Sequence, residues 1–143
     1  MKLLDRRNIV VNSPLTDKEE IIREVGKRMV ESGYVNQSYI EGMLLREESF
    51  PTFMGNGLAI PHGVEAVKKD IIHSGIVVMT FPKAVDWSGN EVRIVIGVAG
   101  AGAEHLEILS IVAEKMLDEE DALRFANADA DTIYQILSEE ETK

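Results

Sequence analysis

Apolar residues recur at intervals of three and four positions between residues 16 and 32, which is the spacing of an amphipathic helix. The pattern Thr16-Asp17-Lys18-Glu19 forms a capping box that would open this helix, and Ser32 with Gly33 would stop it. The buried face would consist of Ile21, Ile22, Val25, Met29 and Val30. We therefore expect a first helix over about residues 16–32.

A second apolar stripe with the same spacing follows. Asn36 is a suitable N-cap for a helix that begins there. Its buried stripe would consist of Tyr39, Ile40, Met43 and Leu44. Arg46 would lie on the last turn, directly before a segment rich in glycine. The pattern thus predicts a guanidinium group at a helix end beside a loop.

Four short segments have the features of strands. Residues 8–11 and 58–60 are short and largely apolar, whereas residues 76–81 and 92–98 are rich in β-branched side chains. Glycine or proline bounds the two longer segments. Continuous apolar runs of this kind are typical of strands that are covered on both faces of a sheet.

The last third of the chain is predicted to be helical. A third helix would begin near Ala103 and place His105 in its first turn. The apolar residues that mark it are Leu106, Leu109, Val112, Ala113 and Met116. Two shorter helices would follow over residues 119–126 and 131–137, with Asp129 or Asp131 near the N-terminus of the second.

Helices before and after the strands predict an α/β fold. A chain of 143 residues, 45% of them hydrophobic, can bury one sizeable core and lies near the common domain size. We expect a single domain over residues 1–143, built as a sandwich with a central mixed β-sheet flanked by about five helices. Residues 139–143 are expected to form a frayed, solvated end.

The charge and composition exclude several classes of function. A formal net charge of -10 disfavours partners that are bound by neutralising phosphates, so we expect no nucleic acid and no anionic membrane. No apolar run approaches the about 18 residues that a membrane span needs, and charges near the N-terminus argue against a signal peptide. We therefore expect a cytoplasmic protein without direct membrane insertion.

Cysteine is absent, which removes disulfides, thiolate metal sites and cysteine nucleophiles. The Walker pattern is also absent, and no acidic pair has an obvious magnesium-binding context. We expect no cofactor and no metal, and any phosphate would have to arrive already activated.

The segment G-N-G-L-A-I-P-H-G, residues 55–63, places one histidine in a tightly specified frame. Its glycines permit backbone angles and close approaches that a β-carbon would block, and Pro61 fixes φ just before His62. His62 would emerge where a short strand ends, a common location for functional sites. Pro-His-Gly also occurs in ordinary turns, so an entirely structural interpretation remains open.

Arg46 and His105 could converge on His62, and an arginine with two imidazoles is typical of phosphate chemistry. At a helix N-terminus, His105 would tend to stay neutral and could donate to a phosphate oxygen or to His62. His105 could instead be a helix-cap histidine, and Arg46 could complement the helix dipole or pair with Glu47 or Glu48. His73, just before a strand, needs no function.

The run from Arg46 to Gly63, followed by the His105 segment, resembles the enzyme IIA domains of the mannitol/fructose class in the bacterial sugar phosphotransferase system. The segment from Ser32 to Gly63 is most similar to the mannitol branch. The resemblance extends over nearly the whole chain and is most specific around Pro61-His62-Gly63.

This resemblance implies a phosphocarrier. His62 would accept phosphate from the phosphocarrier HPr, through a nitrogen that resembles Nε2 in the family, and pass it to a cysteine of a IIB domain of the membrane sugar permease. His105 would assist and stabilise the phosphate, Arg46 would stabilise its charge, and the backbone around Gly57 would contribute N–H donors. The sugar would be mannitol. The residues alone do not distinguish Nε2 from Nδ1.

Two other classes remain open at this stage. The same phosphohistidine could report sugar or nitrogen status to a regulator through a partner protein. Alternatively, His62 and His105 could bind a metal with Glu104 or Glu107, although their separate segments and the lack of a distinguished third ligand argue against it.

Docking to two partners in turn requires a shallow site with apolar surroundings. Apolar residues near His62 that could supply a docking patch are Phe50, Phe53, Met54 and Leu58. The acidic chain could also steer a basic phosphocarrier toward the site, in which case added salt would weaken the association.

Overall fold

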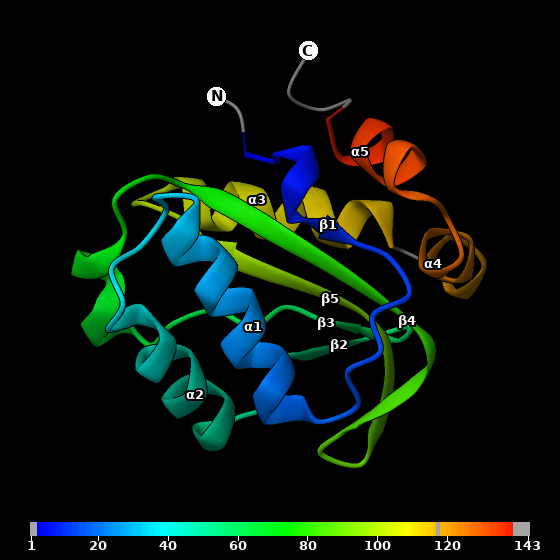
Figure 1. Cartoon of the computed structure of the whole chain (residues 1–143), viewed down its shortest axis with the longest axis horizontal. Helices are drawn as coiled ribbons and strands as arrows, with labels where there is room; N and C mark the ends of the chain where they lie inside the picture. The colour runs from blue at the N-terminus through cyan, green and yellow to red at the C-terminus, as the bar shows by residue number, and fades with distance from the viewer. Residues whose placement is uncertain (1–2, 117, 139–143) are drawn as a thin grey trace.

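A central sheet of five strands lies between two layers of helices in the computed structural model, which describes residues 3–116 and 118–138 (Figure 1). The strands are β1 (Ile9–Val10), β2 (Phe53–Gly55), β3 (Leu58–Ala59), β4 (Gly75–Trp87) and β5 (Asn90–Ala99). They are arranged in the order β1-β4-β5-β3-β2. β1 pairs with β4 and β3 pairs with β5 in parallel, whereas the β4–β5 and β2–β3 pairs are antiparallel. The expected α/β fold with a mixed sheet is confirmed.

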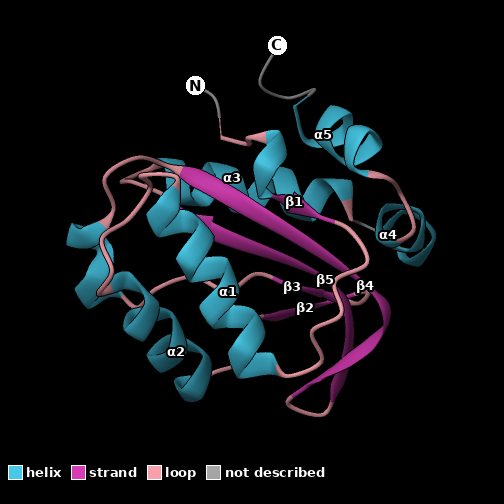
Figure 2. Ribbon diagram, viewed as in Figure 1, coloured by secondary structure: helices cyan, strands magenta, loops and turns pink. Residues whose placement is uncertain are grey.

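The helices cover both faces of this sheet, as Figure 2 shows. One face carries α1 (Lys18–Glu31) and α2 (Tyr39–Ser49), and the other carries α3 (Glu104–Lys115), α4 (Glu119–Ala126) and α5 (Ala130–Ser138). Short 3₁₀ helices occupy η1 (Arg6–Asn8) and η2 (Glu65–Asp70). These bounds confirm the helices expected near residues 16–32, 103–116, 119–126 and 131–137.

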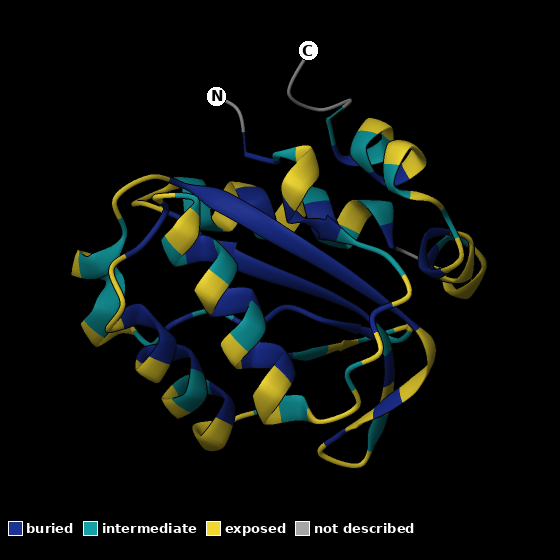
Figure 3. Ribbon diagram, in the orientation of Figure 1, coloured by how far each residue is buried: buried dark blue, intermediate teal, exposed yellow. Residues whose placement is uncertain are grey.

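Alternating side chains of the long strands build one core on each face of the sheet. In β4, Ile76 and Val78 pack with α3, α4 and α5, whereas Val77 and Met79 pack with α1 and α2. This alternation is the two-residue period of a strand, and both sets are apolar because both faces are covered. The buried sheet between partly exposed helices is visible in Figure 3.

The first helix begins one residue later than the capping-box pattern predicts. Asp17 is its N-cap, and the Asp17 carboxylate accepts a hydrogen bond of 3.0 Å from the Glu20 backbone N–H. A carboxylate at this position is favoured by both the free N–H groups and the helix dipole. Thr16 therefore lies outside the helix.

The second helix also differs at both ends from the prediction. It begins at Tyr39, and Asn36 contributes its backbone carbonyl to the turn before the helix, where it accepts from the Tyr39 N–H at 3.0 Å. The helix continues to Ser49, beyond the expected end at Arg46. Arg46 nevertheless lies in the last turns, directly before the segment that leads into β2.

Strand prediction was correct in position and wrong in extent. β4 continues through Pro82 to Trp87. Proline has no backbone N–H to donate to a neighbouring strand, and the register shift between Thr80 and Val85 provides a position where none is needed. β2 was missed, because its three residues are too few to show a period. In the segment 8–11, the strand includes Ile9 and Val10 only. The frayed end predicted for residues 139–143 lies outside the described residues.

Candidate functional site

His62 lies where the extended segment after β3 stops pairing. The Ile60 N–H donates to the Thr52 carbonyl at 3.0 Å, and the Val98 N–H donates to the Pro61 carbonyl at 2.9 Å. These bonds hold the two residues before His62 against β5 and against the segment that leads into β2. The imidazole therefore leaves from a backbone that is fixed on both sides.

One ring nitrogen of His62 is committed to the backbone. Nδ1 lies 2.8 Å from the Ile60 carbonyl oxygen. Because a carbonyl only accepts hydrogen bonds, Nδ1 carries the proton and Nε2 of the neutral ring keeps a lone pair. The sequence left the two nitrogens undistinguished, and this contact leaves Nε2 as the nitrogen with an available lone pair. The residue is half-buried.

The structure brings His105 to His62. The two ring centroids are 5.2 Å apart and the ring planes are inclined by 60°. His105 lies in the first turn of α3, as the sequence predicted. A ligand between the rings would therefore contact imidazole groups from two separate segments.

Close packing between the end of β5 and α3 fixes the position of His105. A β-carbon built on Gly100 would lie only 2.4 Å from the His105 Cα atom, so this approach requires glycine. Ser74 provides a second link, because its hydroxyl donates to Glu104 at 2.6 Å and accepts from the Ala101 N–H at 2.9 Å. The N-terminus of α3 is thereby attached to the residue that precedes β4.

Tyr39 fixes the other side of His62. Its hydroxyl accepts from the Gly63 N–H at 2.9 Å and donates to the Val98 carbonyl at 3.1 Å. A β-carbon on Gly63 would lie 2.7 Å from the Tyr39 ring. Sequence reasoning assigned Tyr39 only to the buried face of a helix, because a helical period does not show which hydroxyl reaches a backbone group.

Arg46 reaches the site from α2. Its guanidinium donates to the Phe50 carbonyl, and its side chain is half-buried. The positive charge of Arg46 helps to lower the pKa of His62. Lys68 of η2 has the same effect on the pKa of both histidines. Sequence reasoning missed Lys68, which follows His62 by six residues in an ordinary charged stretch.

Both imidazoles of the pair favour the neutral form. Burial is the largest cause that lowers the pKa of His62, and the Ile60 hydrogen bond opposes it; Arg46 lowers this pKa further, Glu47 raises it and Lys68 lowers it. The pKa of His105 is lowered first by burial and then by the charges of His62 and Lys68, with Glu65 opposing. A neutral His62 with a free Nε2 is a nucleophile, and the neighbouring cations suit a bound anion.

The structure does not bring Gly57 into this site. Gly57 forms the turn between β2 and β3 with a φ of +75°, and its carbonyl accepts from Arg93 at 2.9 Å and from Ile94 at 3.0 Å. His62 follows Gly57 by five residue steps along an extended segment, which corresponds to roughly 16 Å. The expected phosphate contact from the Gly57 backbone is therefore corrected: the glycine serves a hairpin turn.

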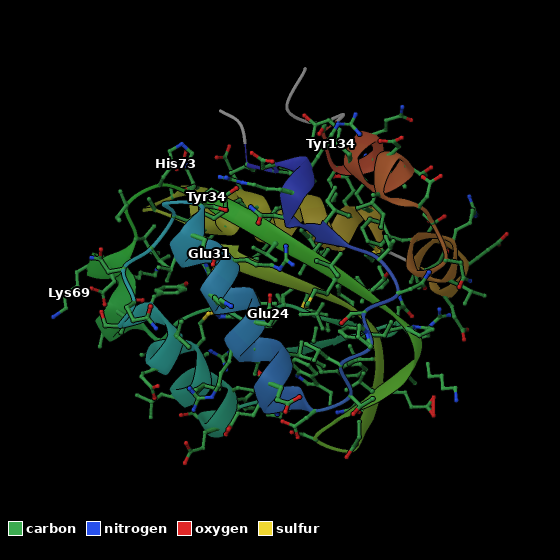
Figure 4. All side chains as sticks on the ribbon, viewed as in Figure 1. Glu24, Glu31, Tyr34, Lys69, His73 and Tyr134 are labelled. Carbon is green, nitrogen blue, oxygen red and sulfur yellow. The ribbon has the colours of Figure 1, made fainter. Side chains whose placement is uncertain are left out.

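His73 lies apart from the pair. It is exposed, its ring stacks on Tyr34 with centroids 6.0 Å apart, and Nδ1 lies 2.6 Å from the Ser74 carbonyl oxygen. Figure 4 shows His73 beside Tyr34 at the edge of the molecule. These contacts account for His73 without any chemistry.

The residues proposed as a docking patch divide between surface and core. Phe50 is 69% exposed and Met54 is 50% exposed, whereas Leu58 is 2% exposed and belongs to the core beneath α3. Phe53 is half-buried against the opposite core. Leu106, directly after His105, is 70% exposed and was missed as a surface residue because its spacing fitted the buried face of α3.

Metal binding receives no support from the described residues, which contain no group of three or more histidine, aspartate or glutamate side chains placed to hold an ion. The Glu104 carboxylate, one of the ligands considered, accepts from Ser74. Within residues 3–116 and 118–138, no helix combines the length and the apolar character needed to cross a membrane.

Comparisons with known proteins agree with this geometry. The sequence model of the family described as phosphoenolpyruvate-dependent sugar phosphotransferase system, EIIA 2, matches residues 2–140. The mannitol-specific phosphotransferase enzyme IIA component of Staphylococcus aureus strain Mu50 is 42% identical over 139 residues, which covers 96% of each chain.

Solved structures give the same result. The structure of IIA mannitol from Escherichia coli is 32% identical, with a TM-score of 0.85 over 94% of this chain and 98% of that one. A chain in the complex of enzyme IIAMTL and phosphorylated enzyme IIBMTL from Escherichia coli is 30% identical, with a TM-score of 0.88 over 95% and 97%. The chain belongs to the EIIA 2 family of the phosphoenolpyruvate-dependent sugar phosphotransferase system.

Proposed function

We propose that this chain is the IIA phosphocarrier of a mannitol phosphotransferase system, in which His62 receives phosphate from HPr and delivers it to a IIB domain. The family supports phosphotransfer, and the mannitol-specific relative of Staphylococcus aureus supports the sugar. The similar Escherichia coli complex joins a IIA protein to a phosphorylated IIB. The observation that carries the residue assignment is the Ile60 contact, which leaves Nε2 of His62 free beside His105.

The first step is an in-line transfer between two imidazoles. The Nε2 lone pair of His62 attacks the phosphorus of phosphohistidine on HPr, a new N–P bond forms, and the leaving nitrogen of HPr keeps the electron pair of the broken bond. No nucleotide is needed, because the donor phosphate is already activated. Donor and acceptor have similar basicity, so the protein mainly supplies alignment and charge stabilisation.

Three groups supply that stabilisation. Arg46 offers a planar set of N–H donors to the equatorial phosphate oxygens, where transition-state charge accumulates. Lys68 adds a second positive charge at the pair. His105, neutral and 5.2 Å away between ring centroids, can donate one N–H to a phosphate oxygen.

The second step reverses the roles. A cysteine thiolate of IIB attacks the phosphorus, an S–P bond forms, and Nε2 of His62 recovers its electron pair. The proton on Nδ1 stays with the Ile60 carbonyl throughout, so no proton has to move at His62. This relay would operate in the cytoplasm, where HPr and the IIB domain are both accessible. The net charge of -10 agrees with protein partners and disfavours nucleic acid.

Reconstitution with phosphoenolpyruvate, enzyme I and HPr tests this function. We expect one acid-labile phosphate per chain in the wild-type protein and none in His62→Ala. His105→Ala should be labelled more slowly but to completion, because it removes a donor and keeps the nucleophile. His73→Ala is the matched control and should label at the wild-type rate. Label retained by His62→Ala would refute the assignment.

A further inference from the structure

A buried carboxylate lies next to the site without a part in the transfer steps described above. The Glu47 side chain, on the last turns of α2, is only 4% exposed. It accepts from the Trp87 indole N–H and forms an ion pair of 3.4 Å with Lys18. Burial of a charge is costly, so a carboxylate at this depth requires several favourable contacts.

Glu47 also accepts from the backbone of the segment before β2. The Thr52 N–H lies 2.8 Å from Oε2 and 3.1 Å from Oε1, so both carboxylate oxygens are directed at one peptide group. Thr52 is itself 5% exposed. A bond between a charged acceptor and a shielded N–H is among the stronger hydrogen bonds in proteins.

From Thr52 a continuous series of hydrogen bonds leads to the proposed phosphate acceptor. The Thr52 carbonyl accepts from the Ile60 N–H at 3.0 Å, and the Ile60 carbonyl accepts from Nδ1 of His62 at 2.8 Å. In each of these bonds the donor points toward Glu47. The backbone of Thr52 and of Ile60 therefore links the carboxylate to the imidazole mechanically, through two residues that are each held on both sides.

This series fixes the position of the Ile60 carbonyl. The charged carboxylate holds the Thr52 backbone, the Thr52 carbonyl holds the Ile60 backbone, and the Ile60 carbonyl holds the ring. A carbonyl held firmly at Nδ1–H fixes the ring tautomer and its orientation, which keeps the lone pair on Nε2. It also stabilises the positive charge that the ring gains when Nε2 is phosphorylated.

We propose that Glu47 is a positioning residue for phosphoryl transfer, which acts on His62 by fixing the backbone of Thr52 and, through it, the Ile60 carbonyl that holds the ring. This inference rests on the proposed function of His62. Among the charged groups that act on the ring, Arg46 and Lys68 lower the pKa of His62, and Glu47 opposes them by raising it. Glu47 thus preserves basicity at a nitrogen that burial and two cations would otherwise weaken.

Glu47→Gln tests the proposal with little change in shape, because glutamine keeps an acceptor for Thr52 and loses the charge. We expect transfer from phospho-HPr to slow about tenfold, the pKa of His62 to fall, and the population of the Nδ1–H tautomer to decrease. Rates from rapid-quench labelling and nitrogen NMR of the imidazole give these readouts. Glu48→Gln, an exposed neighbour with the same change of charge, is the matched control and should match the wild type.

Two results would overturn the proposal. One is an unchanged pKa and tautomer of His62 in Glu47→Gln, whatever the transfer rate, because a slower rate alone would indicate general loosening of the fold. The other is an equal effect in Glu48→Gln. A wild-type protein that acquires no phosphate at His62 would instead refute the proposed function, and wild-type labelling is measured separately from the effects of Glu47→Gln.

A measurement on the unsubstituted protein covers the case in which Glu47→Gln does not fold. Phosphorylation of His62 should shift the NMR signals of the Thr52 and Ile60 amide protons and of the Glu47 carboxyl carbon, because all three belong to the hydrogen-bonded series that ends at the phosphorylated ring. A Glu47 carboxyl signal and a Thr52 amide signal that do not respond to phosphorylation would also overturn the proposal.

Discussion

At the scale of single residues, the site depends on His62 being neutral and correctly oriented. Its Nδ1–H bond to Ile60 specifies which nitrogen can attack, and burial together with Arg46 and Lys68 lowers its pKa. These effects act together, because a ring that stays unprotonated near neutral pH keeps the Nε2 lone pair available. A protonated ring could neither attack phosphorus nor sit beside two cations without cost.

The lowered pKa of His62 predicts how acceptance of phosphate depends on pH. The rate should be constant above pH 6.5, the ordinary value for histidine, and should fall only as the pH drops through the lower pKa of the folded protein. Stability follows the same direction: the contribution from neutral His62 is complete above 6.5 and is lost in acid.

NMR titration of the His62 ring, with labelling rates over the same range, checks this dependence. His73, which is exposed, serves as the internal comparison. A His62 midpoint at or above 6.5 would contradict the account.

Residue roles at the site could be predicted from sequence only in part. His62, Arg46 and His105 stood out because such residue types in this sequence context are unusual. The structure brings the two histidine rings together, and the charge of Arg46 acts on the pKa of His62. Glu47 did not stand out, because two consecutive glutamates, Glu47 and Glu48, are typical of an exposed helix surface. Its burial depends on Trp87, which lies 40 positions further along the chain. Such long-range partners leave no local pattern.

At the scale of elements, two segments must meet at a fixed distance. His62 lies on the extension of β3, and His105 lies in the first turn of α3. β5 relates the two, because β3 pairs with β5 and α3 follows β5 in the chain. Gly100 permits the approach of α3, and the Tyr39 hydroxyl ties Gly63 to the Val98 carbonyl at the end of β5. The spacing of the imidazoles is therefore set by backbone packing as well as by side chains.

Gly100→Ala should separate the two histidines. The new β-carbon would lie 2.4 Å from the His105 Cα, so α3 must shift; we expect a loss of about 1–3 kcal/mol in the free energy of unfolding. Transfer should slow to the rate of His105→Ala. Urea denaturation and labelling rates measure the two effects.

A double variant tests whether Gly100 acts through His105. If it does, Gly100→Ala combined with His105→Ala should be no slower than His105→Ala alone, since the same interaction is removed only once. Additive losses in the double variant would show that Gly100 supports something other than the position of His105.

Element prediction succeeded where periodicity was long and failed where the tertiary context decides. The helices α1 and α3 carry apolar residues over three or four turns, so the sequence pattern was long enough to predict them. β4 was predicted to stop before Pro82, because proline usually ends a strand, and only pairing with β5 on both sides of the register shift carries it to Trp87.

At the scale of the whole molecule, an acidic protein presents a cationic site with apolar residues at its margin. The net charge is -10, while Arg46 and Lys68 lie at the histidine pair. Phe50 and Leu106, both strongly exposed, flank Arg46 and His105 in the sequence. This combination suits brief docking: long-range charge attracts a basic partner, and a small apolar contact area then aligns the phosphate.

Leu106→Ser should weaken docking without altering chemistry. Leu106 is 70% exposed, so the fold should be unaffected, whereas an apolar contact beside His105 would be lost. We expect the apparent KM for phospho-HPr to rise about fivefold, corresponding to roughly 1 kcal/mol, with kcat unchanged. Leu123→Ser, a change of similar exposure on α4, is the control. A lower kcat with unchanged KM would place Leu106 in the chemistry.

The proposed function requires that Nε2 of His62 holds the phosphate because the Ile60 carbonyl occupies Nδ1. Nitrogen and phosphorus NMR of the phosphorylated, isotope-labelled protein tests it most directly. We predict a single phosphohistidine at position 62, with phosphorus coupled to Nε2 and with Nδ1 still protonated. Phosphorus coupled to Nδ1, or bound to any other residue, would contradict the account.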